Sequence, residues 1–432
     1  MRGFLVAAPQ SGSGKTTITL GLLRALRDRG VSLAPAKAGP DYIDPAYHTA
    51  ASGEVCVNLD PWAMRPGLLR RLAGRHAGDD RLLVVEGMMG LFDSAADGNG
   101  SPADLAALLG LPVVLVVDCA RMAHSVAAIV DGFRRHRDDI DFAGVILNRV
   151  GSVRHEEMLL DALEPHDVTV LGTVRADKAL DLPSRHLGLV QAHENENLER
   201  FIADAAFTVT VGVDLDRIEA LTAKPDSEPL PGAISRIPPL GQKIAVARDT
   251  AFGFCYPHLL RGWVQQGAEV AFFSPLADEA PPKDADAIYL PGGYPELYAA
   301  ELAHAARFRV GLRARAAAHV SVFGECGGFM VLGEGLIDAE GQSHRMTGLL
   351  PLVTSYARQT RHLGYRRLSP LKASPWKLPL KAHEFHYSTI VSEGEGERLF
   401  DVRDARGDEL GAAGLRRGSV AGSYMHVIDR AD

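Results

Sequence analysis

Two short stretches of this 432-residue sequence carry residues whose types and spacing suit chemistry. Residues 10–17, QSGSGKTT, place glycines, a lysine and two threonines in the order that binds nucleotide phosphates and magnesium. Residues 324–328, GECGG, surround one cysteine with glycines, as in a sharp strand-to-helix turn that presents a nucleophile. The sequence therefore predicts an ATP site and a reactive thiol, and its reaction must use both.

The phosphate site depends on a strand, a glycine loop and a helix that follow one another. An apolar run precedes the loop, and a helix-like run to Arg29 follows it, with Gly30 available to end the helix. Pro9 stands at the first glycine of the usual motif, and a Gly/Ser-rich turn that happens to precede a lysine is the alternative. We expect ATP contacts from these residues: Gly12, Ser13, Gly14, Lys15, Thr16, Thr17, Lys37 and Asn148.

Carboxylates stand at the ends of two other apolar runs. Glu86 ends one of them, and Asp41 and Asp44 follow the other. In a parallel sheet, ligands bind at the carboxyl edge, so these side chains are candidates for metal and phosphate contacts. Solvated loop charges, and a turn role for Asn148, are the alternatives. The expected magnesium ligands are Thr16, Asp41, Asp44 and Glu86.

Cys326 follows the apolar run HVSVF and precedes a helix-like run, so we expect its sulfur to face solvent over a helix N-terminus with a lowered pKa. Gly292 and Gly293 end another apolar run, where their N–H groups can form an oxyanion hole. His426 lies on a strand-like run near the C-terminus and is the candidate base. A core cysteine and a structural histidine are the alternatives.

The elements that position these residues form two α/β domains. Short apolar runs alternate with helix-length segments over residues 1–215, which predicts a P-loop domain with a parallel sheet. Residues 216–242 are assigned to a linker, because 222–242 hold five prolines and no periodicity. The alternation resumes over 243–432 and ends in a more β-like part.

Composition limits the class of protein. With 46% apolar and 23% charged residues the chain is typical of soluble globular proteins. A formal net charge of −8 argues against nucleic acid or an anionic membrane as the main partner. No membrane-length apolar run or signal-peptide pattern is present, which predicts the cytoplasm. The four cysteines include no C-x-x-C pair, so they predict neither a disulfide framework nor a zinc site.

The residues around Cys326 and His426 resemble a class I, triad-type glutamine amidotransferase, which frees ammonia from glutamine. That family usually has a glutamate two residues after the histidine, where this chain has Ile428, and Asp429 is one residue out of step. A carboxylate reacts with ammonia only after it gains a leaving group, which phosphorylation by ATP supplies. An ATP site and an ammonia source together therefore predict an amide-forming synthetase that works through an acyl phosphate.

Longer motifs resemble the cobyrinic acid a,c-diamide synthase family, whose aerobic-pathway members act on hydrogenobyrinic acid. They include KAGPDYIDP, VEGMMGLFD, LPSRHLGL at 182–189, LPGGYPELY, GECGGFMVLGEGL and HEFHYS at 383–388. The resemblance implies a dethiobiotin-synthetase-like P-loop domain followed by the amidotransferase domain. It also implies ATP, Mg²⁺, glutamine and a corrin-type tetrapyrrole polycarboxylate as the reactants and cofactor; a homodimer is a further expectation.

Basic and polar side chains are the candidates for contact with the acceptor. Arginines suit carboxylates because they bind them through two parallel hydrogen bonds, although an exposed basic strand face is the alternative for each one. HEFHYS falls one residue short of H-E-x-x-H, so a zinc protease is a poor interpretation. The expected substrate contacts are Asp93, Arg358, Arg361, His383 and His386.

Two other functions remain open. A sister amidase, such as nickel-sirohydrochlorin a,c-diamide synthase or cobyric acid synthase, would differ in its acceptor, although HEFHYS and LPSRHLGL favour the a,c-diamide branch over cobyric acid synthase. A P-loop switch ATPase with an inactive amidotransferase module would not be an amidating enzyme at all. The presence of both Cys326 and His426 argues against it.

Overall fold

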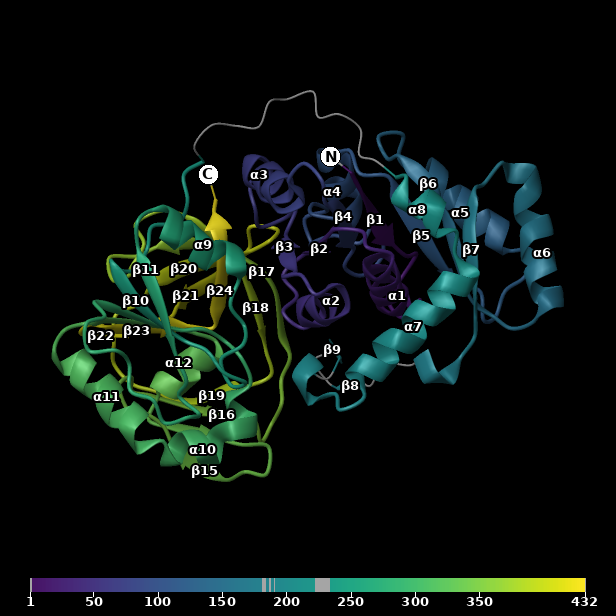
Figure 1. Cartoon of the computed structure of the whole chain (residues 1–432). Helices are drawn as coiled ribbons and strands as arrows, with labels where there is room; N and C mark the ends of the chain where they lie inside the picture. The colour runs from purple at the N-terminus through teal and green to yellow at the C-terminus, as the bar shows by residue number, and fades with distance from the viewer. Residues whose placement is uncertain (1, 181–183, 186–187, 190, 222–233, 432) are drawn as a thin grey trace. The chain divides into compact units, whose positions relative to one another are not determined.

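The computed structural model describes residues 2–180, 184–185, 188–189, 191–221 and 234–431 (Figure 1). The chain forms two compact units. The first comprises Met1–Trp62 and Pro66–Ile234, and the second comprises Ala63–Arg65 and Ser235–Asp432. Two α/β units were expected from the sequence, and each is described by itself below.

The first unit is built on a seven-stranded sheet in the order β3-β2-β4-β1-β5-β6-β7, in which every neighbouring pair is parallel. Most of its strand residues are buried, because a parallel sheet is covered on both faces. The strands are β1 Gly3–Ala7, β2 Leu33–Ala38, β3 Val57–Leu59, β4 Leu82–Glu86, β5 Val113–Asp118, β6 Phe142–Val150 and β7 Val170–Arg175. The order places the ends of β2, β4 and β1 side by side.

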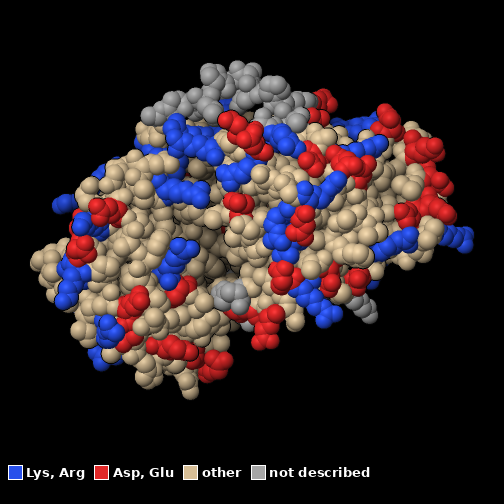
Figure 2. Space-filling view, in the orientation of Figure 1, with Lys and Arg blue, Asp and Glu red and all other residues tan. Residues whose placement is uncertain are grey.

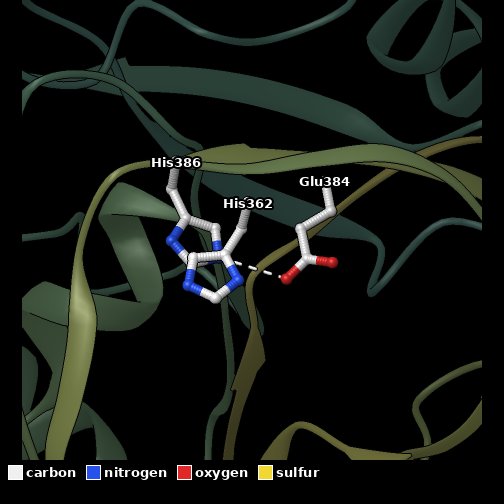
Figure 3. A group of neighbouring side chains, drawn as sticks. All are labelled: His362, Glu384 and His386. Carbon is white, nitrogen blue, oxygen red and sulfur yellow. Dashed lines mark hydrogen bonds and ion pairs between the residues drawn. The ribbon is translucent and has the colours of Figure 1, made fainter. Parts of the chain in front are cut away.

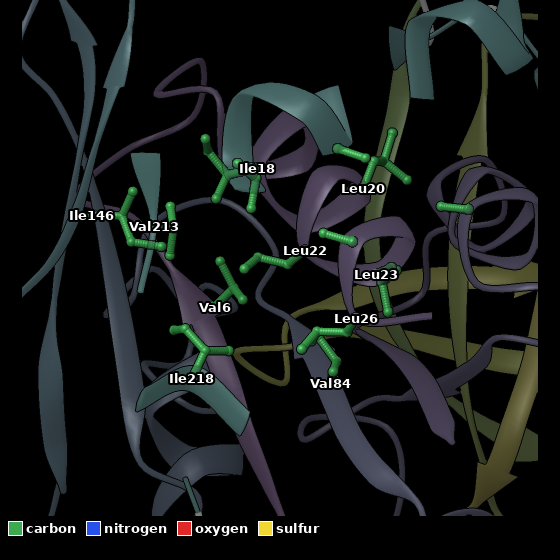
Figure 4. Packing of buried hydrophobic residues seen from close by; sticks show 14 of the residues in the cluster. Val6, Ile18, Leu20, Leu22, Leu23, Leu26, Val84, Ile146, Val213 and Ile218 are labelled. Carbon is green, nitrogen blue, oxygen red and sulfur yellow. The ribbon is translucent and has the colours of Figure 1, made fainter. Parts of the chain in front are cut away.

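The α-helices that connect and cover these strands are α1 Lys15–Asp28, α2 Asp44–Ser52, α3 Pro66–Ala77, α4 Pro102–Leu109, α5 Val126–Arg135, α6 Val153–Leu163, α7 Leu198–Gly212 and α8 Leu215–Glu219. Short 3₁₀ helices cover Glu164–His166, Lys178–Leu180 and Ala192–Glu194. Helix α1 packs against α2 and α7. Figure 4 shows its apolar side chains, among them Ile18, Leu22 and Leu26, packed with Val6 of β1 and Val84 of β4.

The parallel sheet predicted for this unit from its alternating apolar runs and helix-length segments is confirmed. The predicted linker start at 216 falls inside α8, because Leu215 and Ile218 are buried in the core of the first unit. Residues 222–233 of the linker lie outside the described residues. So does much of the motif at 182–189, of which only the short strands β8 Ser184–Arg185 and β9 Gly188–Leu189 are described.

The second unit contains a six-stranded sheet in the order β11-β10-β12-β13-β23-β22, with only the β22–β23 pair antiparallel. Its strands are β10 Lys243–Ala247, β11 Glu269–Phe273, β12 Ala287–Leu290, β13 Ser321–Glu325, β22 Leu415–Arg417 and β23 Val420–Ser423. Its helices are α9 Pro257–Gln265, α10 Ala299–His304, α11 Ala306–Ala317 and α12 Gly327–Leu332, with a 3₁₀ helix at Pro295–Tyr298.

Two further sheets form the β-rich part that was expected near the C-terminus. A five-stranded antiparallel sheet has the order β21-β20-β17-β18-β24 and a four-stranded sheet has the order β15-β14-β16-β19. The five strands are β17 His362–Pro370, β18 Leu380–His386, β20 Phe400–Asp404, β21 Glu409–Ala413 and β24 Met425–Arg430. The four are β14 Gly335–Ile337, β15 Ser343–Arg345, β16 Leu352–Ser355 and β19 Thr389–Glu393. Pairing of β18 with β24 brings the HEFHYS motif next to His426.

Within the described ranges, no helix combines the length and apolar character needed to cross a membrane. Basic and acidic side chains are interspersed over the face drawn in Figure 2. Exposed pairs such as Arg137 and Asp139, 2.6 Å apart, illustrate this mixing.

Candidate functional site

The phosphate-binding loop joins β1 to α1, as predicted. Gly12 and Gly14 have φ of 82° and 83°, a backbone conformation that glycine adopts without strain. Gly14 also has no room for a side chain, since a Cβ there would lie 2.2 Å from Nδ2 of Asn148. That amide nitrogen donates to the carbonyl oxygen of Ser13 at 2.9 Å. Asn148 therefore fixes the loop backbone, and contact with the adenine stays a prediction.

Glu86, at the end of β4, is the centre of the charged cluster beside this loop. Its side chain is completely buried, and its Oε1 accepts a hydrogen bond from Thr16 Oγ1 at 2.7 Å. The same oxygen lies 2.9 Å from Nζ of Lys37 and 3.9 Å from Nζ of Lys15. Burial alone would raise the pKa of Glu86, but the neighbouring Lys37 and His48 hold this pKa well below its usual value.

Lys37 joins two of the predicted carboxylates. Its Nζ lies 2.5 Å from Oδ2 of Asp44 and 2.9 Å from Glu86. Burial by itself would lower the pKa of Lys37, but these two carboxylates raise this pKa well above its usual value. Burial lowers the pKa of Lys15, whose carboxylate neighbour is more distant. The structure thus brings Lys15, Lys37, Asp44 and Glu86 together, as the sheet-edge argument predicted.

The oxygens at this edge fit a magnesium ion. The Thr16 hydroxyl and the Glu86 carboxylate converge to 2.7 Å, and oxygens of both kinds are ligands that Mg²⁺ prefers. Burial and the charge of Asp44 raise the pKa of Asp41 to about 6, so a bound cation would favour its ionised form. Asp44 already gives one oxygen to Lys37. Glu86 likewise gives Oε1 to Lys37, so these contacts do not distinguish among the four expected ligands, and metal binding by Thr16, Asp41, Asp44 and Glu86 stays a prediction.

His48 is a member of this cluster that the sequence argument missed. It is completely buried, and its Nε2 lies 2.5 Å from Oε2 of Glu86. Asp44 and His48 stand four residues apart on α2, which places them on the same face of that helix. That spacing was the available signal, but the partner on β4 is distant in sequence.

Two other predicted residues of the first unit have local roles in the structure. Asp93 is exposed, and its Oδ2 accepts a hydrogen bond from the N–H of Gly90 at 2.7 Å. Thr17 Oγ1 donates to the carbonyl oxygen of Leu180 at 3.3 Å. The contact of Asp93 with the acceptor and that of Thr17 with ATP stay predictions.

The strand-to-helix turn at the thiol is confirmed. Cys326 joins β13 to α12 with φ of 46° and ψ of −104°, and its N–H donates to the carbonyl oxygen of Ser423 at 2.8 Å. Its expected exposure and lowered pKa are wrong, because the residue is only 3% exposed and burial raises the pKa of its thiol above the usual range. The free thiol is thus protonated and needs a base.

His426 and the glycine pair lie at this turn. A Cβ on Gly292 would lie 2.3 Å from Cε1 of His426, and a Cβ on Gly327 would lie 3.0 Å from the nitrogen of Gly293. The glycine pair is therefore next to both the imidazole and the residue that follows Cys326. Burial, with His383 and His386, lowers the pKa of His426 to about 3, so its imidazole is neutral.

Glu325, the residue before Cys326, supplies a carboxylate that the family pattern did not predict. It is 1% exposed, and its Oε2 lies 3.9 Å from Nδ1 of His426. Tyr289 donates to that oxygen at 2.7 Å, and the N–H of Val427 donates to Oε1 at 3.3 Å. Asp429 is held elsewhere, with its Oδ2 3.0 Å from Nε of Arg65. Burial raises the pKa of Glu325 to about 8.

The expected acceptor residues of the second unit fall into two groups. Arg358 and Arg361 are exposed in the segment before β17. His383 and His386 are buried on β18, and His383 lies opposite His426 in the strand register. Their contact with substrate stays a prediction.

Comparison with known proteins supports both units. Residues 4–190 match the CobQ/CobB/MinD/ParA nucleotide binding domain, and residues 243–432 match the CobB/CobQ-like glutamine amidotransferase domain. The chain is 63% identical to hydrogenobyrinate a,c-diamide synthase of Brucella anthropi, over 99% of both chains. It is 62% identical to that of Rhizobium meliloti over 99% of both, and 48% identical to that of Mesorhizobium japonicum over 100% of this chain and 99% of the relative. Likeness of this extent, end to end and across both candidate sites, means that the chain belongs to the hydrogenobyrinate a,c-diamide synthase family.

Proposed function

We propose that this enzyme uses ATP and glutamine to convert the a and c side-chain carboxylates of hydrogenobyrinic acid to amides. The observation that carries the proposal is the presence, in one chain, of a phosphate loop with a charged cluster at Glu86 and a cysteine turn beside His426. The near-full-length relatives named for this reaction supply the acceptor. A cytoplasmic location belongs to the same proposal. So does a homodimer, which size-exclusion chromatography would test.

Ammonia is released at the second unit. Neutral His426 takes the proton of the Cys326 thiol, and the thiolate attacks the carboxamide carbon of glutamine. The N–H groups of Gly292 and Gly293 stabilise the oxygen that becomes negative. The histidine then gives its proton to the departing ammonia, and water hydrolyses the thioester to glutamate and restores the thiol.

Glu325 takes the place of the glutamate that the family usually has after the histidine. A carboxylate on the Nδ1 side of His426 favours the imidazolium that forms when the thiol proton is transferred. Its 3.9 Å separation from Nδ1 is longer than a hydrogen bond, and its other contacts, with Tyr289 and Val427, fix its position. Glu325 is thus a positioning residue that acts through His426.

Activation of the acceptor uses the first unit. An acceptor carboxylate attacks the γ-phosphorus of ATP, ADP leaves, and an acyl phosphate forms; ammonia then attacks the acyl carbon and phosphate leaves. Lys15 and Lys37 carry the positive charge that binds and stabilises the phosphate oxygens. Mg²⁺, held by Thr16, Asp41, Asp44 and Glu86, would neutralise charge on the phosphates.

The test is incubation with ATP, magnesium and glutamine, with hydrogenobyrinic acid, cobyrinic acid and nickel-sirohydrochlorin offered in parallel. Mass spectrometry should find two amides added to hydrogenobyrinic acid, with one ADP formed per amide. Conversion of neither corrinoid, or a product with four further amides, would assign the chain to a sister amidase. Absence of glutaminase activity would instead favour an inactive amidotransferase module.

A further inference from the structure

Three side chains with metal-binding atoms share one face of the sheet formed by β17 and β18. His362 lies directly opposite His386 in the register, and Glu384 precedes His386 by two residues. Because side chains alternate between the faces of a strand, all three project to the same side. Their ligand atoms lie within 4.8 Å of one another, and Figure 3 shows the carboxylate of Glu384 directed toward the two imidazole rings.

The contacts around the cluster hold two of these groups in a ligand-like arrangement. Nδ1 of His386 lies 3.1 Å from the carbonyl oxygen of Ser388, which can only accept, so Nδ1 carries the hydrogen. Ser388 uses its own hydroxyl hydrogen on Tyr424 Oη at 2.9 Å. Nε2 of His386 then faces Oε1 of Glu384 at 3.1 Å. With the hydrogen on Nδ1, Nε2 of His386 presents a lone pair to the carboxylate oxygen of Glu384. That contact is favourable only when a proton or a metal cation lies between the two atoms.

The second carboxylate oxygen of Glu384 is also fixed. Nε of Arg366 donates to Oε2 at 2.7 Å, on the oxygen that does not face His386. Metal-ligating carboxylates and imidazoles are commonly held in this way, by a hydrogen bond from or to the atom that does not bind the metal. Both groups therefore present one directed atom to the same point.

We propose that His362, Glu384 and His386 bind one divalent transition-metal ion, with zinc as the expected ion. Two imidazoles and one carboxylate form a ligand set that zinc uses, with water in the fourth position. This site goes beyond the proposed function and does not depend on it. The sequence argument missed it because the spacing of Glu384 and His386 suits a strand, and the third ligand comes from a neighbouring strand.

Binding requires a movement of His362. Its ring stacks on that of His386 with centroids 4.6 Å apart and 15° between planes, whereas a metal lies close to the plane of each ring that binds it. His362 is the first residue of β17 and is partly exposed, so its ring can rotate toward the ion. The Cys326 sulfur lies 3.8 Å from the carbonyl oxygen of Phe385, between the two ligands of β18. The ion would therefore brace the strand beside the thiol.

The experiment measures zinc binding by the full chain after dialysis against a chelator. Cys326→Ser is the background, so that the thiol cannot take the ion. Competition with a chromophoric chelator should give one zinc per chain, and Co²⁺ should give the visible absorption of a four-coordinate site. Loss of an outer-shell partner already weakens metal affinity by about 10–100-fold, so His362→Ala and His386→Gln should each weaken binding by more than that.

His344→Gln is the matched control, because His344 is also paired with a carboxylate, Asp338, at 2.6 Å, but lies outside the cluster. It should bind zinc as the background does. Since His386 stacks on Tyr424, its variant could fail to fold; His362→Ala, at a partly exposed strand end, tests the site independently. Zinc should also raise the Tm of the background but not that of His362→Ala. No binding at 100-fold excess of zinc, or equal binding by all variants, would overturn the proposal.

Discussion

Replacing Glu325 by glutamine tests the assignment of the third member of the glutaminase site. The change keeps the shape of the side chain and its contact with Tyr289 but removes the negative charge 3.9 Å from His426 Nδ1. We expect the kcat of glutamine hydrolysis to fall with little change in KM, because the carboxylate stabilises the imidazolium formed in the reaction. Synthesis from added ammonium salt should be unaffected.

The size of the effect follows from the distance and from the pKa. Two unit charges about 4 Å apart interact by about 4 kcal/mol at an effective dielectric constant of about 20. The pKa of Glu325 is about 8, so ionising it at pH 7 costs about 1.4 kcal/mol. The difference, about 2.6 kcal/mol, corresponds to a loss of roughly 100-fold in kcat at pH 7. Above pH 8 this cost vanishes and the loss should grow.

The pH profile separates positioning from a structural role. Glutaminase activity of the unchanged enzyme should rise as Glu325 ionises through about pH 8, and the variant should lack that rise. The groups that face Glu325 include Tyr289, Cys255 and His426, and the first two ionise at higher pH because burial raises their pKa. Stability should respond in the opposite sense. A carboxyl whose folded pKa is raised destabilises the fold as pH rises from about 4.5 to 8, so the glutamine variant should be the more stable protein at pH 8.

Glutamate release, measured across pH 6–9, is the assay, and Glu393→Gln is the control because it removes a carboxylate that pairs with Arg398. A variant rate within twofold of the unchanged enzyme at every pH would refute the role of Glu325. An equal loss of ammonia-driven synthesis would refute it too, since that reaction does not use the thiol.

Other substitutions separate the two sites. Cys326→Ser should abolish glutamine-dependent synthesis and keep synthesis from ammonium salt; continued use of glutamine would contradict the thiol assignment. Lys15→Ala and Glu86→Gln should each lose both reactions by at least about 100-fold, because they act on phosphoryl transfer, and ammonia-driven activity in either variant would remove that residue from the centre. Gly292→Ala should lose glutaminase activity, since the added Cβ would lie 2.3 Å from the ring of His426, and a normal rate would show that this histidine is free to move away.

The parts of the fold and site that the sequence predicted are those with a local cause. β1, the loop at Gly12–Lys15 and α1 follow one another in the chain, and the glycines that permit the loop are visible in the sequence. The turn at Cys326 was predicted for the same reason. The neighbours Lys37 and Glu86 were predicted because parallel strands end at one edge of the sheet.

What could not be predicted depends on contacts between distant segments. His48 reaches Glu86 across 38 positions, and nothing near either residue specifies that pair. Glu325 lies beside the nucleophile in sequence, but its approach to His426 depends on the path of β24. The predicted direction of the Cys326 pKa shift was wrong. A helix N-terminus, which lowers a thiol's pKa, is visible in the local sequence, whereas burial, which raises it and dominates here, comes from the whole unit.

Burial acts in opposite ways at the two sites. In the first unit, Lys37 and Glu86 are both buried, and each favours the charged form of the other. In the second unit, burial favours the neutral forms of Glu325, Cys326 and His426. A site that binds ATP and Mg²⁺ is best kept charged, because its lysines attract the phosphates and its carboxylates attract the metal ion. A thiol that must not react before glutamine arrives is best kept neutral, since charge then appears only when His426 accepts its proton and the glycine N–H groups donate hydrogen bonds to the oxyanion.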